Sequence, residues 1–133
     1  MKQESRMTYA HKREIMFSFR ETVLKTKVEL AKEGFGVLTE IDVKTTLKEK
    51  LNADYDNYLI LGACNPPFAY EALKAERDIG LFLPCNVLVY EDEGKVFVAA
   101  ILPSVAMGMI ENSSLAEIAK TVEEKLKKAV DAI

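Results

Sequence analysis

The sequence is poor in the residues that build metal centres and disulfides. It has two cysteines and a single histidine, His11, and these cannot supply four Cys/His ligands to a zinc ion within one chain. Its first residues lack the apolar segment of a secretory signal, so we expect a cytoplasmic protein. Because thiols in that compartment are kept reduced, a structural disulfide is the less favoured interpretation of the two cysteines.

Long hydrophobic runs and an excess of positive charge are also missing. The most apolar stretch spans twelve residues, from Ile79 to Tyr90, and is interrupted by Pro84. A membrane-spanning helix needs about 20 apolar residues, so we expect a buried strand here and no membrane segment. A net charge of −3 argues against the basic surface that binds nucleic acid.

Signature motifs of common enzymes are absent as well. The sequence contains no Gly-rich phosphate loop, no dinucleotide-binding fingerprint, no nucleophile elbow and no His-Glu-x-x-His zinc motif. We therefore predict no cofactor and no metal, and we assign no catalytic residue.

The composition that remains is that of one globular domain. The 133 residues are 49% apolar and 29% charged, and a chain of this size buries about two-thirds of its surface on folding. We expect a single domain over residues 1–133, with a globular part from residue 9 onward and a flexible segment over residues 1–8.

Capping and turn residues predict where the helices and strands begin. Residues 18–21 and 114–117 have the Ser-x-x-Glu pattern of a capping box. Asn65-Pro66 is typical of a helix start, and residues 92–94 (Asp-Glu-Gly) indicate a hairpin. The expected strands cover residues 9–17, 35–43, 58–63, 81–91 and 95–102, and the expected helices cover residues 19–33, 43–51, a segment from 66 and a segment from 114 to the end.

This order, β-α-β-α-β-α-β-β-α, predicts an α+β domain with a mainly antiparallel sheet and flanking helices. Short connections and the terminal hairpin favour antiparallel pairing, whereas a doubly wound parallel sheet is the alternative, since helices separate the first four strands. The first two helices should each bury an apolar stripe. The expected stripes are Phe19, Val23, Leu24, Val28 and Ala31 on the first helix, and Val43, Leu47 and Leu51 on the second.

Two Cys-Asn pairs are the leading candidates for a site. Cys64 ends a predicted strand just before a helix, whose N-terminal N–H groups favour a thiolate or a bound anion. Cys85 follows Pro84, and a proline inside a strand indicates an edge, a bulge or a kink. If the two strands are neighbours, both thiols face one pocket together with Asn65 and Asn86. The alternative is that the cysteines are small buried core residues.

Two further segments carry candidate residues. Glu40 and Asp42 lie about 6.6 Å apart on one face of a strand, which suits acid/base chemistry or a hard cation; alternatively Asp42 caps the next helix and Glu40 is solvated. Residues 107–110 (Met-Gly-Met-Ile) form an apolar loop that lines a pocket, contacts another subunit or covers the core. His11 has no evident partner and is expected on the surface.

Three segments, Gly34–Val43, Leu61–Pro66 and Leu81–Val87, occur together in this order. On these segments the sequence resembles the bacterial and archaeal "domain of unknown function 302" family, over about residues 9–133. The resemblance implies a compact α+β domain with an antiparallel sheet, often paired into dimers. It implies no established activity and carries over no functional residue.

Three functional hypotheses follow from the residues and the resemblance. The first is a homodimeric module that binds a small polar or anionic ligand at Cys64, Asn65, Cys85 and Asn86, with Glu40 as a further candidate. The second is a thiol redox or thiol-transfer protein that uses Cys64 and Cys85. The third is a structural or regulatory interaction domain without a ligand, whose contact surface includes residues 107–110 and the N-terminal strand.

Overall fold

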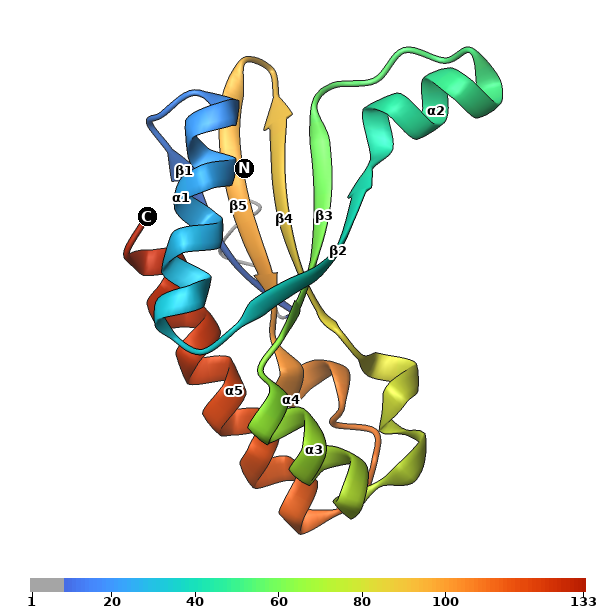
Figure 1. Cartoon of the computed structure of the whole chain (residues 1–133), viewed down its shortest axis with the longest axis vertical. Coiled ribbons are helices and arrows are strands. Elements are labelled where there is room, and N and C mark those ends of the chain that lie inside the picture. The colour runs from blue at the N-terminus through green and yellow to red at the C-terminus, as the bar shows by residue number, and fades with distance from the viewer. Residues whose placement is uncertain (1–8) are drawn as a thin grey trace.

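The computed structural model describes residues 9–133, and its centre is a five-stranded sheet (Figure 1). The expectation of a flexible segment over residues 1–8 lies outside the described residues. In chain order the elements are β1 (Ala10–Ile15), α1 (Phe19–Lys32), β2 (Gly36–Asp42), α2 (Val43–Leu51), β3 (Tyr58–Cys64), α3 (Pro66–Ala75), the 3₁₀ helix η2 (Arg77–Phe82), β4 (Cys85–Asp92), β5 (Lys95–Ile101), α4 (Pro103–Ala106) and α5 (Ser113–Asp131).

The sheet has the strand order β1-β5-β4-β3-β2, and every neighbouring pair is antiparallel. The predicted α+β class with flanking helices is confirmed, and the parallel alternative is wrong. The register places Leu61 opposite Val87 and Val89 opposite Val98. Because side chains alternate between the two faces of a strand, these four buried residues lie on one face.

Helices α1 and α5 cover that face and close the main core (Figure 1). Leu30 of α1 and Leu126 of α5 are each 1% exposed and belong to the same cluster as the buried strand residues. Helix α5 is amphipathic along its whole length, and its buried residues are Leu115, Ala119, Val122, Leu126, Ala129 and Val130. The predicted helix start needs a correction, because Asn112, rather than Ser114, caps α5 and accepts a hydrogen bond from Leu115 N at 3.0 Å.

The first helix begins as predicted but buries a different stripe. Ser18 Oγ accepts from Glu21 N at 3.1 Å, and Glu21 Oε1 accepts from Ser18 N at 3.3 Å, which forms the capping box. The stripe prediction is partly wrong, because Leu24 and Val28 are exposed by 59% and 54%. The fully buried residues are instead Thr22, Thr26 and Leu30.

Burial of Thr26 on α1 is made possible by a hydrogen bond within the helix, whereas the buried Thr22 hydroxyl has no partner among the described residues. Thr26 Oγ1 donates to Thr22 O at 2.7 Å, so its hydroxyl needs no partner from the sheet. Hydrophobic periodicity missed this stripe because threonine counts as polar, although its methyl group packs like an apolar side chain.

The apolar stretch over residues 79–90 is only partly a strand. Arg77–Phe82 forms η2, and β4 starts at Cys85, so the predicted strand over residues 81–91 begins four residues too early. Pro84 has no N–H to donate to a neighbouring strand. Ile79 is fully buried in a small second core, whereas Leu81 is 85% exposed, so the segment has no continuous buried face.

Helix α2 lies at the edge of the molecule and projects beyond β2 (Figure 1). Asp42 caps it as predicted, since its Oδ1 accepts from Thr45 N at 3.0 Å. None of the residues of α2 is buried, and Leu51 is 70% exposed. The predicted inward stripe is therefore correct in part, since Val43 and Leu47 are half-buried, and wrong for Leu51. Among residues 9–133, no helix has the length and apolarity to span a membrane.

Candidate functional site

The two Cys-Asn segments meet where β3 ends and β4 begins. Ala63 pairs with Cys85 and Gly62 pairs with Asn86, so Cys64 is one residue from the position opposite Cys85. The hypothesis that the two thiols belong to neighbouring strands is thus correct. Both cysteines are free.

Cys64, Asn65 and Cys85 border one cavity of about 30 Å³. It lies between the end of the sheet and helices α3, α4 and α5, and the rest of its wall is apolar. Four alanines leave room there, namely Ala63, Ala69, Ala72 and Ala119. Since one water molecule needs about 10–15 Å³ of such space, the cavity admits a guest of only a few heavy atoms.

A second, wider hollow of about 260 Å³ adjoins the first. The two share Leu83, Pro84 and Cys85 as a common wall, and Asn86 borders only the outer one. Cys85 therefore separates the two spaces. The inner cavity is lined mainly by apolar groups, and the outer hollow has the amide of Asn86 at its margin.

Asn65 holds this corner in place without capping α3. Its side chain makes no capping hydrogen bond; Nδ2 donates to Glu33 O at 3.0 Å, one of the carbonyls left free at the end of α1. Asn65 is only 7% exposed. The predicted N-cap role of its side chain is thus wrong, because the amide group donates instead to a carbonyl 32 residues earlier in the chain.

Gly34 makes the approach of Asn65 possible. Its φ is +89°, and a Cβ there would lie 3.1 Å from Asn65 Nδ2. A side chain at this position would therefore be strained and would crowd the amide.

The start of α3 offers little to an anion. Pro66 and Pro67 occupy its first two positions, and proline has no N–H. The N–H of Ala69 is already donated to Asn65 O at 2.9 Å. The polar or anionic ligand expected from the helix N-terminus therefore loses its main support.

The environment of Cys85 disfavours a thiolate. Burial, with a smaller contribution from nearby Cys64, raises the pKa of Cys85 from its usual value of 9.0 to about 11. Its side chain is 6% exposed, whereas Cys64 is half-buried. At neutral pH Cys85 is a neutral thiol, which is a poor nucleophile.

Glu40 does not reach this site. It lies on β2 and forms an ion pair with Lys27 of α1, on the helix-covered side of the sheet, while Asp42 is used as a helix cap. Among residues 9–133, no group of three or more His, Cys, Asp and Glu side chains is arranged to hold a metal ion.

Met107 belongs to the cavity wall. It is 8% exposed and packs with Ile79 and Leu115, whereas Met109 is 77% exposed. The expectation that residues 107–110 cover the core or line a pocket is correct for Met107, whose burial leaves little of its side chain for a subunit contact.

Gly62 and Thr39, which shape the site, were given no role in the sequence hypotheses, and Pro84 was interpreted there only as a break in a strand. Gly62 has no room for a side chain, because a Cβ there would lie 2.2 Å from Thr39 Oγ1 and 2.7 Å from Pro84 Cγ. The close packing of Thr39 and Pro84 over Gly62 holds β2 and the β4 entry against β3. A glycine inside a strand is a known sign of such a close approach, so the sequence carried the signal.

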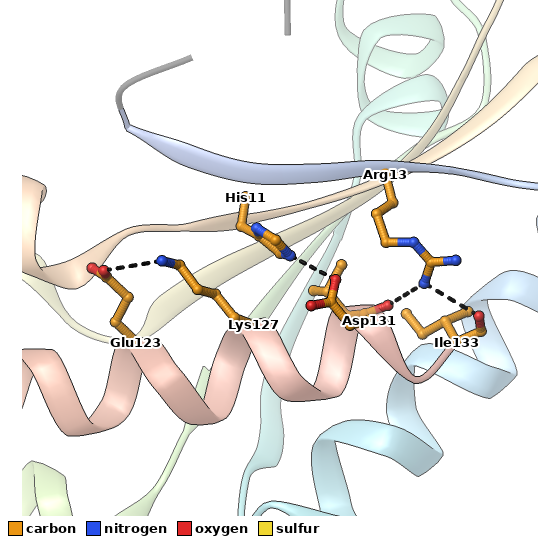
Figure 2. A network of polar contacts seen from close by, with 7 residues as sticks. His11, Arg13, Glu123, Lys127, Asp131 and Ile133 are labelled. Carbon is orange, nitrogen blue, oxygen red and sulfur yellow. Dashed lines mark hydrogen bonds and ion pairs between the residues drawn. The ribbon is translucent and has the colours of Figure 1, made fainter. Parts of the chain in front are cut away.

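The end of α5 is fixed to β1 by a polar network, away from the cavity (Figure 2). His11 Nε2 lies 2.7 Å from Asp131 Oδ1, which corrects the expectation of a histidine without a partner. Arg13 Nη1 donates to Val130 O at 2.7 Å and to Ile133 O at 3.3 Å. A cation at the C-terminal end of a helix satisfies its free carbonyls and opposes the helix dipole.

Comparison with known proteins matches the chain to a family model and to solved structures. A family model described as "Domain of unknown function DUF302" matches residues 11–133. A solved crystal structure of an uncharacterized conserved protein DUF302 from Bacillus stearothermophilus is similar to this chain, with 31% sequence identity and a TM-score of 0.88. The similarity covers 94% of this chain and 98% of that one. No curated protein matches the chain.

Proposed function

Because the chain belongs to the DUF302 family, whose description assigns no activity, we propose a function from its own geometry: the protein is a small-ligand binding module. The proposed site is the cavity beside Cys64, Asn65 and Cys85, with Asn86 at the margin of the adjoining hollow. The observation that carries the proposal is that two thiols and a buried amide, from two segments of the chain, border one space.

The wall of the cavity narrows the class of ligand. Apart from Asn65 and the two thiols it is apolar, and small-molecule sites commonly combine an apolar wall with a few polar groups that set orientation. We therefore favour a molecule of a few heavy atoms that is apolar except for one hydrogen-bond donor facing Asn65 Oδ1. An anionic ligand has less support, because the prolines remove N–H groups from the start of α3.

A titration with small probes tests this function. We expect ethanol, acetamide or xenon to shift the NMR resonances of Cys64 and Asn65, and a probe held at 100 times its Kd to raise stability by about 2.7 kcal/mol. Sulfate serves as the anionic probe. Ala119→Val fills the cavity from α5 and should weaken binding at least about tenfold, whereas Ala116→Val, on the exposed side of the same helix, should bind like the wild type.

Two results would contradict the proposal. One is that no probe shifts these resonances up to its solubility limit. The other is that Ala119→Val responds to the probes as the wild type and Ala116→Val do, because the cavity would then not be where they bind.

The thiol redox role is the second candidate, supported by the shared cavity of Cys64 and Cys85. It has less support than ligand binding, since the raised pKa of Cys85 keeps it from acting as a thiolate at neutral pH. Two free thiols also support the cytoplasmic location that we propose.

We propose further that the module works as a homodimer. The support is that the described chain leaves both a helix and a sheet face without a covering element. This also keeps the interaction-domain hypothesis compatible with ligand binding, because no residue of α2 borders the cavity.

A further inference from the structure

The outer face of the sheet is apolar, and in the part of the chain that the structure describes no helix covers it (Figure 1). Helices α1 and α5 pack against the opposite face. The register aligns two rows across the uncovered face. They consist of the aromatic residues Tyr58, Tyr90 and Phe97, and of the aliphatic residues Ile60, Leu88 and Ala99.

The aromatic row is ordered by its own contacts. The Tyr58 and Tyr90 ring centroids are 5.2 Å apart, and those of Tyr90 and Phe97 are 5.5 Å apart. Lys12 Nζ lies 4.7 Å from the Phe97 centroid and closes one end of the row. The three rings therefore form an ordered row, and the small side chain of Ala99 leaves the sheet surface lower beside it.

Helix α2 is the complementary case, a helix whose apolar residues are only partly covered. Its apolar residues are Val43, Leu47 and Leu51; the first two are half-buried against β2 and β3, whereas Leu51 is exposed. A helix of nine residues is well below the length at which helices are stable in isolation, about 12–15 residues. Its contacts with β2 and β3 within one chain bury none of its residues fully, so further packing against a second surface would stabilise it.

Size and charge match α2 to the uncovered face of a second copy. A nine-residue helix is about 13.5 Å long, and five strands span about 19 Å. Helix α2 carries Lys44, Lys48 and Lys50 against one glutamate, whereas the β4–β5 hairpin carries acidic residues at positions 91–93. Both lie at the same end of the sheet, because α2 leads into β3 at Tyr58 and Tyr58 pairs with Tyr90.

We propose that two copies of this chain exchange their α2 helices, so that α2 of each packs on the uncovered sheet face of the other. The inference rests on the proposed homodimer and assigns its surface. A two-fold axis uses the same contact twice, which leaves neither a free helix nor a free sheet face. The lysines of α2 then approach the acidic hairpin of the partner.

Sedimentation measurements on full-length variants test the exchange. We expect the wild type to dimerise, and Leu51→Lys to raise the dimer dissociation constant about 100-fold, since the buried leucine is lost twice. Leu51 is exposed in the single chain, so the substitution should not affect folding. Leu24→Lys is the matched control, because Leu24 is also exposed but lies on α1, and it should dimerise like the wild type.

The sheet side of the contact needs its own variant. Leu88→Lys should weaken the dimer to a similar extent, and circular dichroism should show that the fold is kept. If Leu88→Lys unfolds, Ile41→Lys on β2 replaces it. Ile41 is 49% exposed and pairs with Ile60 of the aliphatic row. A wild type that stays monomeric at 100 times the concentration of the binding assay would overturn both the dimer and the exchange, but not the ligand site. A wild-type dimer that Leu51→Lys and Leu24→Lys leave equally tight would overturn the exchange alone.

Discussion

Cys85 illustrates how burial at the end of a strand changes the chemistry of a single residue. Removal from water disfavours the charged thiolate, and the pKa of Cys85 rises to about 11. Such a thiol is suited to the wall of a binding cavity more than to nucleophilic attack. The neighbouring Cys64, which is half-buried, is the more accessible of the two sulfur atoms.

The raised pKa predicts a loss of stability at high pH. Below about pH 8.5 the thiol is neutral in the folded and unfolded chain, so its full contribution is present. Between pH 9 and 11 the unfolded chain ionises first, and up to about 2–3 kcal/mol of the free energy of unfolding is lost. Urea denaturation at pH 8.5 and pH 11 should show this loss in the wild type and in Cys64→Ala.

The control for this prediction is Cys85→Ala. Its free energy of unfolding is lower at every pH because the cavity grows. The decrease between pH 8.5 and pH 11, however, should be about 2–3 kcal/mol smaller than in the wild type. An equal decline in Cys85→Ala and in the wild type would show that ionisation of Cys85 makes no contribution.

At the scale of the element, α5 depends on the contacts at both of its ends. Asn112 caps its start and also donates through Nδ2 to Ala75 O at 2.8 Å, which ties α5 to the end of α3. At the other end Arg13 of β1 donates to two carbonyls (Figure 2). Because α5 covers both the main core and the cavity, its position decides the shape of the site.

Arg13→Met should loosen the end of α5. It keeps the aliphatic stem and removes two hydrogen bonds from a charged donor, so we expect a loss of about 1.5–3 kcal/mol in the free energy of unfolding. Hydrogen exchange should become faster over the last turn before Asp131. Lys120→Met removes a charge from the exposed side of the same helix and should change neither quantity by more than about 0.5 kcal/mol. Equal effects of the two substitutions would contradict a specific role for Arg13.

At the scale of the whole molecule, the structure divides into a well-packed body and an arm. The body is the sheet with α1 and α5 on one face, together with α3, η2 and α4 at one end. The arm is α2 with the end of β2, an edge strand whose residues are nearly all exposed. An edge strand with exposed apolar residues is open to pairing with another chain, so the arm is the part of the molecule that most needs a partner.

Hydrogen exchange on dilution tests this division. The amides of Val43–Leu51 should exchange slowly at concentrations where the dimer forms and at least about tenfold faster after dilution below its dissociation constant. The amides of β4, which is central in the sheet, should not respond to dilution. If α2 exchanges at the same rate at all concentrations, its stability comes from within one chain.

Much of the fold could be predicted from spacing over three or four residues. The Ser18–Glu21 capping box and the Asp42 cap were correct, since a cap joins residues that are three apart in any helix. The hairpin between β4 and β5 and the antiparallel class were likewise predictable from a short turn. The approach of the two Cys-Asn segments followed once β3 and β4 were neighbours.

By itself, the sequence determined where most helices and strands begin, the class of the sheet and the two segments that form the candidate site, because these depend on contacts between residues close in the chain. Only the tertiary structure decided that Thr22 and Thr26 are buried while Leu24 is exposed. The same is true of the hydrogen bond from Asn65 to Glu33 O and of the ion pair between Glu40 and Lys27. In each case the deciding partner is distant in sequence or belongs to another element. Burial and hydrogen bonding depend on which surfaces meet in the folded chain, and a local sequence pattern does not determine which surfaces those are.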